Sequence, residues 1–503
     1  MAKMNSATPS AAGADRAVAT LLDSAHWSGN VYTGAWRRSD STITVREPAT
    51  GEVLGVVGES QPADLAAVVA TARAAQGPWA ARPADERAAL MRRAARLLEE
   101  QRESLLAAII RETGGVPGKA HVELSGTIDE LYHSAALLIQ PEGHVLPSAD
   151  PSRLSLARRV PIGIVGVITP WNFPMVLAMR SVAPALALGN AVILKPDVQT
   201  SIVGGAVLAR LFEEAGLPPG VFSVINGGAT VGEALVEAPG VRMITFTGST
   251  AVGRRVGELG GKHLKRVALE LGGKSPFIVL EDADLEAAAA AGAWGSFLHQ
   301  GQICMASGRH IVVRKVIDEY LHILKRKAEA LPVGDPFREQ VAIGPIINQK
   351  QVRRIQQIVD DSTAAGATLL TGGTHQGLFY KPTVLSNVRA GMPAYDLEIF
   401  GPVAPVIVAE DEADAVRIAN DTEYGLSGAV QTGSLERGLR VAAQIKSGLV
   451  HVNDQTIHDF AGIPFGGSGA SGNGSRFGSI NNWEEFTEWR WTTIGSTQAK
   501  YPF

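Results

Sequence analysis

Alternating apolar runs and helical stretches between residues 161 and 271 constrain the fold of this chain most. Residues 162–168 are a nearly continuous apolar run, as a parallel strand buried on both faces requires. Helical stretches are expected at 175–188, which ends at Gly189-Asn190, and at 202–215, which ends at Gly216. Further apolar runs, separated by helical or turn segments, are residues 191–194, 222–225, 243–247 and 267–271. This order predicts βαβ units in a doubly wound parallel sheet, which binds ligands beyond the carboxyl ends of its strands.

The same alternation returns in the second half of the chain. The expected strands are residues 276–280, 310–313, 403–409 and 449–453, and the expected helices are 285–297, 317–331 and 413–419. With 503 residues the chain is too long for one ordinary core. We therefore expect an α/β protein with one domain at 1–139 and 161–272 and a second at 273–463.

Three other segments carry a clear pattern. Residues 83–112 have apolar side chains at helical spacing, which predicts a single helix that ends at Thr113-Gly114-Gly115. Residues 152–160 and 485–491 alternate polar and apolar side chains, as strands do. We expect residues 152–160 to form an edge strand, whose free hydrogen-bonding groups are available to pair with a partner such as another subunit.

Charge and composition exclude several classes of protein. A net charge of −4 shows no excess of basic residues that would bind a polyanion, so we expect no nucleic-acid partner. Residues 1–19 lack the apolar core of a secretory signal, and no apolar run reaches membrane-spanning length. A single cysteine fits a reducing cytoplasm and forms neither an intrachain disulfide nor a multi-cysteine metal site. We expect a cytoplasmic protein without a membrane partner or a metal.

That cysteine, Cys304, is either inert packing or a reactive thiol. It follows a helix-forming stretch that Gly301 breaks, so a nearby backbone N–H is available to receive an oxyanion. Glu270 ends an apolar run upstream, and a thiol with a carboxylate that activates water indicates acyl chemistry through a thioester. On this pair alone, a buried and unreactive cysteine is the commoner situation.

Several strand ends carry groups that suit a phosphorylated cofactor. Gly248 and Ser249 follow an apolar strand and open a helix whose N–H groups, capped by Ser249, can face a phosphate. The segment is not Gly-x-Gly-x-x-Gly, and plain helix initiation explains it equally well. Lys195, at the next strand end, reaches ribose hydroxyls or phosphate, or is simply solvated.

Two loops offer polar groups beside aromatic rings. Asn172 lies in a rigid loop, Thr169-Pro170-Trp171-Asn172-Phe173-Pro174, where its amide is an oxyanion donor or a turn cap. Glu398 and Phe400 flank a turn. Either Glu398 binds a ribose and Phe400 packs beside a ring of the ligand, or the two residues only cap a loop.

Taken together, these stretches resemble the aldehyde dehydrogenase superfamily. The similarity runs in sequence order across most of the chain, through Pro161-Ile162-Gly163, 170–174, Gly189-Asn190, Lys195-Pro196, 246–250, 270–274, 301–304, 398–402 and Asn453 to 464–467. The resemblance implies a Rossmann-type nicotinamide-cofactor domain, a second α/β catalytic domain and a small β oligomerisation element. Residues 140–160 and 484–503 would be the oligomerisation strands of a homodimer or homotetramer.

The resemblance also implies roles for the site residues. Cys304 would attack the aldehyde carbon, Asn172 and the Cys304 N–H would hold the oxyanion, and hydride would pass to the nicotinamide. Glu270 would then activate the water that hydrolyses the thioester. The implied cofactor contacts are Thr169, Trp171, Lys195, Gly248, Ser249, Gly253, Glu398 and Phe400.

Departures from the family pattern bear on the cofactor and the substrate. Asp197 stands near the position where many NAD-linked members have a ribose-binding Glu, and its charge disfavours a 2′-phosphate, so we expect NAD, with NADP as the alternative. Ser181 and Arg476 occupy the places of a Lys and a Glu proposed as a proton relay in some relatives.

Arg180-Ser181, residues 453–458, the Gly-Ser-Gly-Ala-Ser-Gly run and residues 486–491 resemble the benzaldehyde/vanillin dehydrogenase branch, whose substrates are aromatic aldehydes. The expected substrate pocket is Phe173, Val176, Arg180, Met305, His458 and Phe465, with Trp171 beside it. His458 could touch a ring hydroxyl, or be a structural histidine.

Rival interpretations remain. An aliphatic aldehyde or semialdehyde dehydrogenase would use Arg180 or Arg476 as the cation for a carboxylate. A hydrolase that uses Cys304 without a nicotinamide leaves the Gly248 turn, Lys195 and Glu398 without a role. A catalytically silent binding or structural member is disfavoured because both Cys304 and Glu270 are present.

Overall fold

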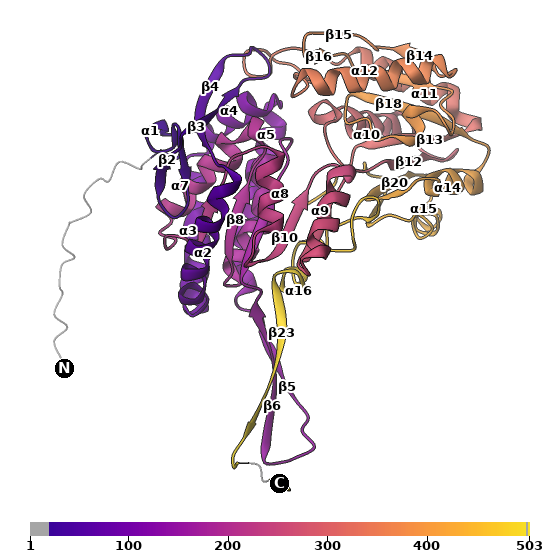
Figure 1. The fold of residues 1–503 in the computed structure, drawn as a ribbon. Helices are drawn as coiled ribbons and strands as arrows, with labels where there is room; N and C mark the ends of the chain where they lie inside the picture. The colour runs from indigo at the N-terminus through magenta and orange to yellow at the C-terminus, as the bar shows by residue number, and fades with distance from the viewer. Residues whose placement is uncertain (1–19, 499–500) are drawn as a thin grey trace, which may run out of the picture.

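The computed structural model describes residues 20–498 and 501–503, so the prediction about a signal in residues 1–19 lies outside the described residues. Two lobes lie side by side, and a narrow three-stranded arm projects from the base of the molecule (Figure 1). Chain order follows this division, with the first lobe indigo to magenta and the second mostly orange to yellow.

The first lobe is built on a seven-stranded sheet in the order β11-β10-β7-β8-β9-β1-β2. Its five central strands are parallel, and the two N-terminal strands extend one edge in antiparallel fashion. The strands are β7 (Ile164–Ile168), β8 (Ala191–Lys195), β9 (Phe222–Val224), β10 (Val241–Thr247), β11 (Arg266–Glu270), β1 (Asn30–Tyr32) and β2 (Trp36–Arg38). Every apolar run predicted as a strand between residues 161 and 271 is therefore confirmed as one.

Helices cover both faces of this sheet because its strands bury alternate residues in two separate cores. Val165 and Val167 of β7 join one core with residues of α3, α5, α6 and α7, while Ile164 and Ile168 join the other with α2, α8 and α9. The helices are α1 (Ser24–Trp27), α2 (Leu65–Ala80), α3 (Ala84–Glu100), α4 (Arg102–Thr113), α5 (Pro117–Leu137), α6 (Pro174–Ala187), α7 (Val207–Glu214), α8 (Ala229–Glu237) and α9 (Thr250–Lys262). A hairpin of β3 (Ser41–Arg46) and β4 (Val53–Glu59) completes the lobe.

Two helix predictions need correction. The single helix expected over 83–112 is two helices, because Gln101 leaves helical geometry (φ −107°, ψ 18°) and its side chain accepts a hydrogen bond from the Leu21 N–H at 2.7 Å. The helix expected from residue 202 begins with a π-helical turn at Ile202–Ala206. There the buried Glu112 carboxylate accepts hydrogen bonds from the Ile202 and Val203 N–H groups at 2.8 and 2.7 Å.

The second lobe has its own seven-stranded sheet, in the order β14-β17-β18-β13-β12-β20-β21, parallel except for β14. Its strands are β12 (Ser275–Val279), β13 (Ser307–Val313), β14 (Thr368–Thr371), β17 (Thr383–Ser386), β18 (Val403–Ala409), β20 (Ser427–Gln431) and β21 (Leu449–Val452). The helices are α10 (Leu285–Phe297), α11 (Ile317–Glu329), α12 (Gln349–Ala364), α13 (Pro393–Asp396), α14 (Glu412–Asn420) and α15 (Leu435–Ala442). Two small pairs, β15 (His375–Gln376) with β16 (Phe379–Tyr380) and β19 (Tyr424–Gly425) with β22 (Ser468–Gly469), lie outside the sheet.

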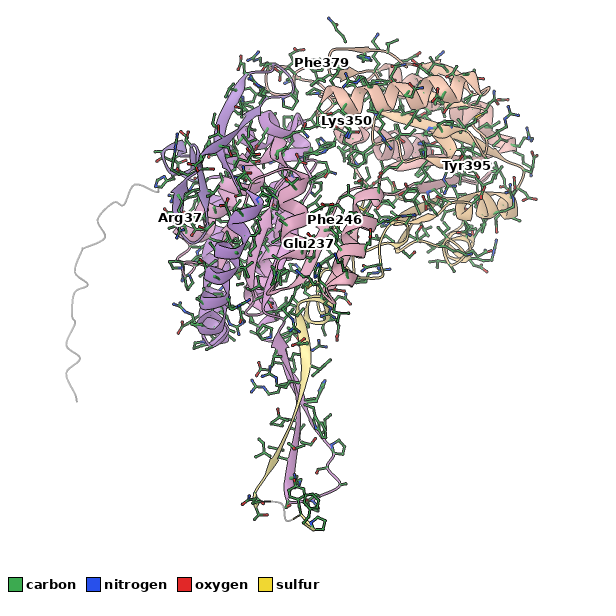
Figure 2. The ribbon with its side chains drawn as sticks, viewed as in Figure 1. Arg37, Glu237, Phe246, Lys350, Phe379 and Tyr395 are labelled. Carbon is green, nitrogen blue, oxygen red and sulfur yellow. The ribbon has the colours of Figure 1, made fainter. Side chains whose placement is uncertain are left out.

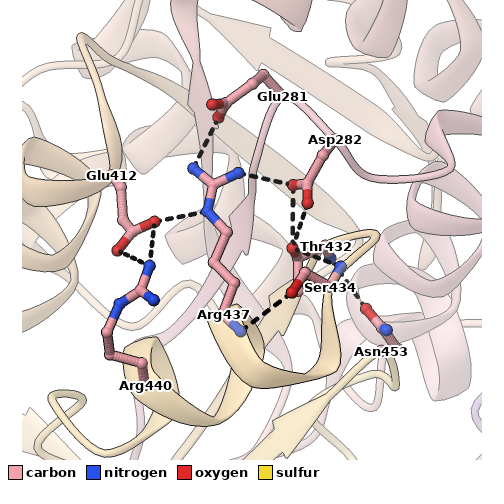
Figure 3. A network of polar contacts seen from close by, with 8 residues as sticks. All are labelled: Glu281, Asp282, Glu412, Thr432, Ser434, Arg437, Arg440 and Asn453. Carbon is pink, nitrogen blue, oxygen red and sulfur yellow. Dashed lines mark hydrogen bonds and ion pairs between the residues drawn. The ribbon is translucent and has the colours of Figure 1, made fainter.

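An ion-pair network joins two helices, α14 and α15, to the end of β12 in this second sheet. Arg437 at the start of α15 binds Asp282 and Glu281 after β12 and Glu412 at the start of α14, with nitrogen–oxygen distances of 2.9, 3.0 and 2.6 Å (Figure 3). We call these four residues the Arg437 network. Beside it, the Asn453 side chain accepts a hydrogen bond from the Thr432 N–H at 2.9 Å, which fixes the start of the loop after β21.

The arm consists of β5 (Gly143–Leu146), β6 (Arg153–Pro161) and β23 (Thr487–Gly495), and the short helix α16 (Asn481–Phe486) leads into it. The prediction that residues 152–160 form an edge strand is wrong, because β6 is the central strand and pairs with β5 and β23 on its two sides. Its hydrogen-bonding groups are therefore used within the chain, and the free edges belong to β5 and β23. Within the described residues, no helix is long and apolar enough to cross a membrane.

Candidate active site

Segments from both lobes meet at Cys304, and glycines allow the approach. After α10 the backbone turns through His299, Gln300 and Gly301 with φ of 48°, 57° and 66°. A Cβ on Gly301 would lie 2.2 Å from the Gly401 carbonyl oxygen, and one on Gly273 would lie 2.2 Å from the Cys304 carbonyl oxygen. Any larger residue at these two positions would push the Cys304 loop away from its neighbours.

The Cys304 side chain is partly exposed and belongs to a small apolar group. We call this group the Cys304 cluster; its members are Phe173, Leu298, Ile303, Cys304, Met305, Ala306, Leu426, Leu449, Ile457, Ile463 and Phe465. Burial raises the pKa of the thiol to about 12, and the nearby carboxylates of Glu398 and Glu270 add to the rise. The thiol therefore carries its proton at neutral pH and needs a base to become a nucleophile.

Glu270 is the candidate for that base, since its charge raises the pKa of the Cys304 thiol. It ends β11 with its side chain 4% exposed, and neither carboxylate oxygen has a hydrogen-bond partner within the described part of the chain. Burial raises the pKa of this carboxyl well above its usual range, while the charges of Arg180 and Arg476 oppose that rise. A carboxylate with a raised pKa is a stronger proton acceptor, which suits general-base work near neutral pH.

Asn172 lies on the loop after β7 and points at the Cys304 segment. Its side chain is 3% exposed, and the amide nitrogen donates to the Gln302 carbonyl oxygen at 2.9 Å, two residues before Cys304. An amide nitrogen carries two hydrogens, so one N–H is left to donate to an oxyanion. Asn172, Glu270 and Cys304, which the sequence places far apart, thus meet in one site.

The turn predicted to hold a phosphate is present, but two of its details differ from the prediction. The Gly248 N–H donates to the Glu270 carbonyl oxygen at 3.0 Å, so it does not face a ligand. Ser249 occupies the N-cap position of α9, yet its exposed side chain makes no capping bond. The first hydrogen bond within α9 runs from the Gly253 N–H to the Ser249 carbonyl oxygen at 2.9 Å. The backbone N–H groups just before Gly253 therefore have no acceptor within the helix. Phe246, the last residue but one of β10, lies on the side of the first lobe that faces the second (Figure 2).

Two charged residues predicted to bind ribose lie on opposite lobes. Lys195 ends β8 and is 9% exposed; burial lowers its pKa, and the charge of Asp197 opposes that change. Asp197 also accepts a hydrogen bond from the Gln199 N–H at 2.9 Å, which keeps its carboxylate near Lys195. Glu398 accepts a hydrogen bond from the Gly273 N–H at 3.0 Å and so lies beside the Cys304 segment.

Aromatic rings face one another between these residues. The ring of Trp171 meets the ring of Phe400 edge-on, with centroids 5.4 Å apart. Phe400 has a φ of 57°, a strained backbone for a residue of its size. The nearby Thr169 hydroxyl is buried without a hydrogen-bond partner in the described residues. The two aromatic rings offer a flat apolar surface for a nicotinamide ring, and the unpaired Thr169 hydroxyl offers a hydrogen bond for its carboxamide.

The residues expected to line the substrate pocket divide into two sets. Phe173, Met305 and Phe465 are members of the Cys304 cluster. His458 lies elsewhere: its ring is largely exposed, bonds the Asp454 carboxylate at 2.7 Å and stacks on His451. Val176 turns towards α5, where a Cβ on Gly126 would lie 3.1 Å from it.

Arg180 is buried against the Cys304 cluster, with its guanidinium carbon 4.2 Å from the centroid of the Phe465 ring. Its nitrogens pair with Asp459 and, at 3.5 Å, with Glu130. Sequence reasoning missed both carboxylates. The signal for them was an arginine inside an apolar helix, since such a charge needs partners, but nothing in the sequence says which acids they are. No group of three or more potential metal-ligating side chains occurs in residues 20–498 or 501–503.

Comparisons with known proteins agree with this geometry. The aldehyde dehydrogenase family matches residues 36–492. A vanillin dehydrogenase from Amycolatopsis sp. is 54% identical over 96% of this chain and 100% of its own length. A benzaldehyde dehydrogenase [NAD(+)] from Pseudomonas putida is 48% identical over 95% of this chain and 98% of its own. The crystal structure of an NAD-dependent benzaldehyde dehydrogenase from Corynebacterium glutamicum superposes with a TM-score of 0.84 at 40% identity, covering 94% of this chain and 98% of that one.

Proposed function

The chain belongs to the aldehyde dehydrogenase family, and we propose that it oxidises an aromatic aldehyde of the benzaldehyde or vanillin type to the carboxylic acid with NAD. The observation that carries this proposal is the Cys304 cluster. It gathers the rings of Phe173 and Phe465 in the same apolar cluster as the thiol, which supports a flat apolar substrate. The similarity to vanillin and benzaldehyde dehydrogenases supports the same substrate class.

The proposed reaction begins with the thiol of Cys304. Glu270 takes the thiol proton as the sulfur bonds to the aldehyde carbon, because a thiol whose pKa is about 12 forms little thiolate unaided. The carbonyl oxygen becomes an oxyanion that accepts hydrogen bonds from the Asn172 amide and the Cys304 N–H. NAD, when bound, supplies the acceptor for the hydride that leaves this carbon. Cys304 then carries the acyl group as a thioester.

Hydrolysis uses the same base a second time. After losing its first proton to solvent, Glu270 takes a proton from water as the water oxygen bonds to the thioester carbon. The carbon–sulfur bond breaks, the carboxylic acid leaves, and the proton returns to the Cys304 sulfur. Burial that raises the pKa of Glu270 helps both steps, since each one needs a proton acceptor.

The residues present fit a nicotinamide cofactor. Lys195 and Glu398 would hold ribose hydroxyls, the N-terminus of α9 would face the pyrophosphate, and Phe400 with Trp171 and Thr169 would border the nicotinamide. Asp197 keeps a negative charge near Lys195, which opposes the 2′-phosphate of NADP and favours NAD.

We infer that the arm binds a second copy of the chain. The arm exposes large apolar side chains that a monomer leaves in water, among them Trp491, Val145 and Ile494 at 70%, 72% and 51% exposure. We place these on an interface of a homodimer or homotetramer, and we place the protein in the cytoplasm because its mechanism needs a reduced thiol.

The test is the initial rate of reduced-nicotinamide formation with benzaldehyde, vanillin, hexanal and succinic semialdehyde, each with NAD and with NADP. We expect the aromatic aldehydes with NAD to lead in kcat/KM by about tenfold or more. Cys304→Ala is the blank and should show no activity. A lead by hexanal or the semialdehyde would overturn the substrate assignment, and activity in the blank would overturn the mechanism.

A further inference from the structure

Three buried charged residues beside the Cys304 cluster form an unusual group. They are Arg180 in α6, Glu130 in α5 and Asp459 in the loop after β21, and we call them the Arg180 triad. The Arg180 Nη2 pairs with Asp459 Oδ2, and Arg180 Nε lies 3.5 Å from Glu130 Oε1. The side chains are 8%, 2% and 17% exposed in the order Arg180, Glu130, Asp459.

The triad packs against the Cys304 cluster. The Arg180 guanidinium lies over the Phe465 ring, and Asp459 lies in the same loop as two further members of the Cys304 cluster, Ile457 and Ile463. In keeping with these contacts, the charge of Arg180 lowers the pKa of the Cys304 thiol and that of Asp459 raises it.

Each member of the triad has one buried polar atom left over. Arg180 Nη1, Glu130 Oε2 and Asp459 Oδ1 have no hydrogen-bond partner anywhere in the described residues. Buried polar atoms are almost always hydrogen-bonded, because leaving one unpaired costs the free energy of removing it from water. The triad therefore presents one free donor and two free acceptors at the edge of the Cys304 cluster.

This set of free atoms matches the chemistry of a hydroxyl group. A phenol oxygen accepts from an N–H and its hydrogen is donated to a carboxylate, so a single hydroxyl uses the Arg180 donor and a carboxylate acceptor together. Burial raises the pKa of Glu130 to about 7, so near neutral pH the triad has no net positive charge to attract a carboxylate on the ligand. A methyl group would leave all three atoms unpaired.

We propose that the Arg180 triad binds a hydroxyl group on the ring of the aldehyde, so that hydroxylated benzaldehydes are preferred over unsubstituted ones. This inference rests on the proposed oxidation of aromatic aldehydes. Arg180 Nη1 donates to the hydroxyl oxygen, and Asp459 Oδ1 or Glu130 Oε2 accepts its hydrogen. The triad is thus a specificity-determining group rather than the cation of a semialdehyde site.

The kinetic test uses benzaldehyde and its 2-, 3- and 4-hydroxy and matching methyl derivatives with the wild type, Arg180→Lys, Asp459→Asn and Glu130→Gln. The quantity compared is the quotient of kcat/KM for a hydroxy derivative and its methyl partner. Intrinsic reactivity cancels when this quotient is compared between variants. For at least one ring position we expect the wild-type quotient to fall about tenfold in Arg180→Lys and Asp459→Asn, with kcat/KM for benzaldehyde changed less.

Arg210→Lys is the matched control, because Arg210 is also buried and pairs with Glu213 and Glu214, but on α7 away from the site. It should keep the wild-type quotient. A quotient that stays unchanged in all three triad variants at every ring position would overturn the inference. Failure to oxidise any benzaldehyde while hexanal reacts would instead overturn the proposed function.

A binding measurement on the wild type avoids variants that fail to fold. Phenol and toluene are compared as ligands that slow alkylation of Cys304 by iodoacetamide. We expect phenol to protect the thiol at concentrations at least about tenfold lower than toluene, since only phenol satisfies the free atoms of the triad. Equal protection by toluene would contradict the proposed hydroxyl site.

Discussion

Two arginine-centred groups in this protein differ in a way that separates structure from function. In the Arg437 network each of the three guanidinium nitrogens has a carboxylate, and the arginine side chain is 19% exposed. In the Arg180 triad the arginine is 8% exposed, and Nη1 lacks a partner among the described residues. The Arg437 network joins α14 and α15 to the end of β12 and is complete by itself. The triad borders the reactive thiol and has bonding capacity left for a ligand.

The difference between the two groups is hydrogen-bonding capacity left unused beside the Cys304 cluster, and not the presence of ion pairs; unused capacity alone does not mark the site, since Arg210 Nε is also buried without a partner among the described residues. Glu270 shows the same property, because both its oxygens are buried and unpaired within the described residues. Such atoms destabilise the fold and persist where a substrate or water uses them. Variants in the site and in the Arg437 network should therefore change different measured quantities.

The largest effect is expected from Glu270→Gln. Loss of the general base should lower steady-state kcat for benzaldehyde by about 10³-fold, while the free energy of unfolding stays the same or rises, because a buried ionisable group is removed. The measurements are kcat and a urea unfolding curve. Arg437→Met should leave kcat within about twofold of the wild type, and a loss of kcat comparable to that of Glu270→Gln would break the comparison.

Asn172→Ala should lower kcat/KM by about 10²-fold, because one of the two oxyanion donors is lost. It also removes the hydrogen bond to the Gln302 carbonyl, so the Cys304 loop should become more mobile. Initial rates with benzaldehyde measure the first effect. A variant that keeps full activity would show that the oxyanion is held by other groups.

The pH dependence of thiol alkylation tests the environment of Cys304. With a pKa of about 12, the thiol should react with iodoacetamide roughly fiftyfold more slowly than a free cysteine below pH 9, allowing for the greater nucleophilicity of a more basic thiolate. The rate should keep rising with pH above 9, where a free thiol levels off. A plateau near pH 8 would show that the thiol is not held in its protonated form. Arg437→Met should show the same profile as the wild type.

The smallest effect is expected from Arg437→Met. Removing a partly exposed arginine that serves three carboxylates should lower the free energy of unfolding by about 1–2 kcal/mol, less than for a fully buried pair because water screens the charges. Urea unfolding measures this change. No loss of stability, together with a loss of activity, would reverse the roles assigned to the two groups.

Much of this arrangement could be predicted from the sequence because it depends on local pattern. Apolar runs such as Ile164–Ile168 mark buried parallel strands, and the residues after them, including Asn172, necessarily gather at one edge of the sheet. Lys195 and Glu270 end their own strands at that edge for the same reason.

The remaining features depend on contacts between distant segments. The break at Gln101 interrupts a stripe that would suit one continuous helix, so only the packed structure shows it. Glu130 and Asp459 are ordinary acids in the sequence. The sequence predicts His458, next to Asp459, as a pocket residue or a structural histidine, whereas its ring is largely exposed. The hydrogen bond from Asn172 to Gln302 likewise joins two lobes whose relative placement no local pattern contains.

The central claim is that Cys304 carries the acyl group of the substrate during turnover. Intact-protein mass spectrometry of Glu270→Gln, incubated with benzaldehyde and NAD for many wild-type turnover times and quenched in acid, tests it directly. Without Glu270, the small thiolate fraction still attacks the aldehyde slowly, whereas no base remains to activate water, so the thioester should accumulate. We predict a mass increase of one benzoyl group, located by peptide mapping to the segment that contains Cys304 and absent from Cys304→Ala. Formation of reduced nicotinamide without any acyl group on that segment would contradict the account.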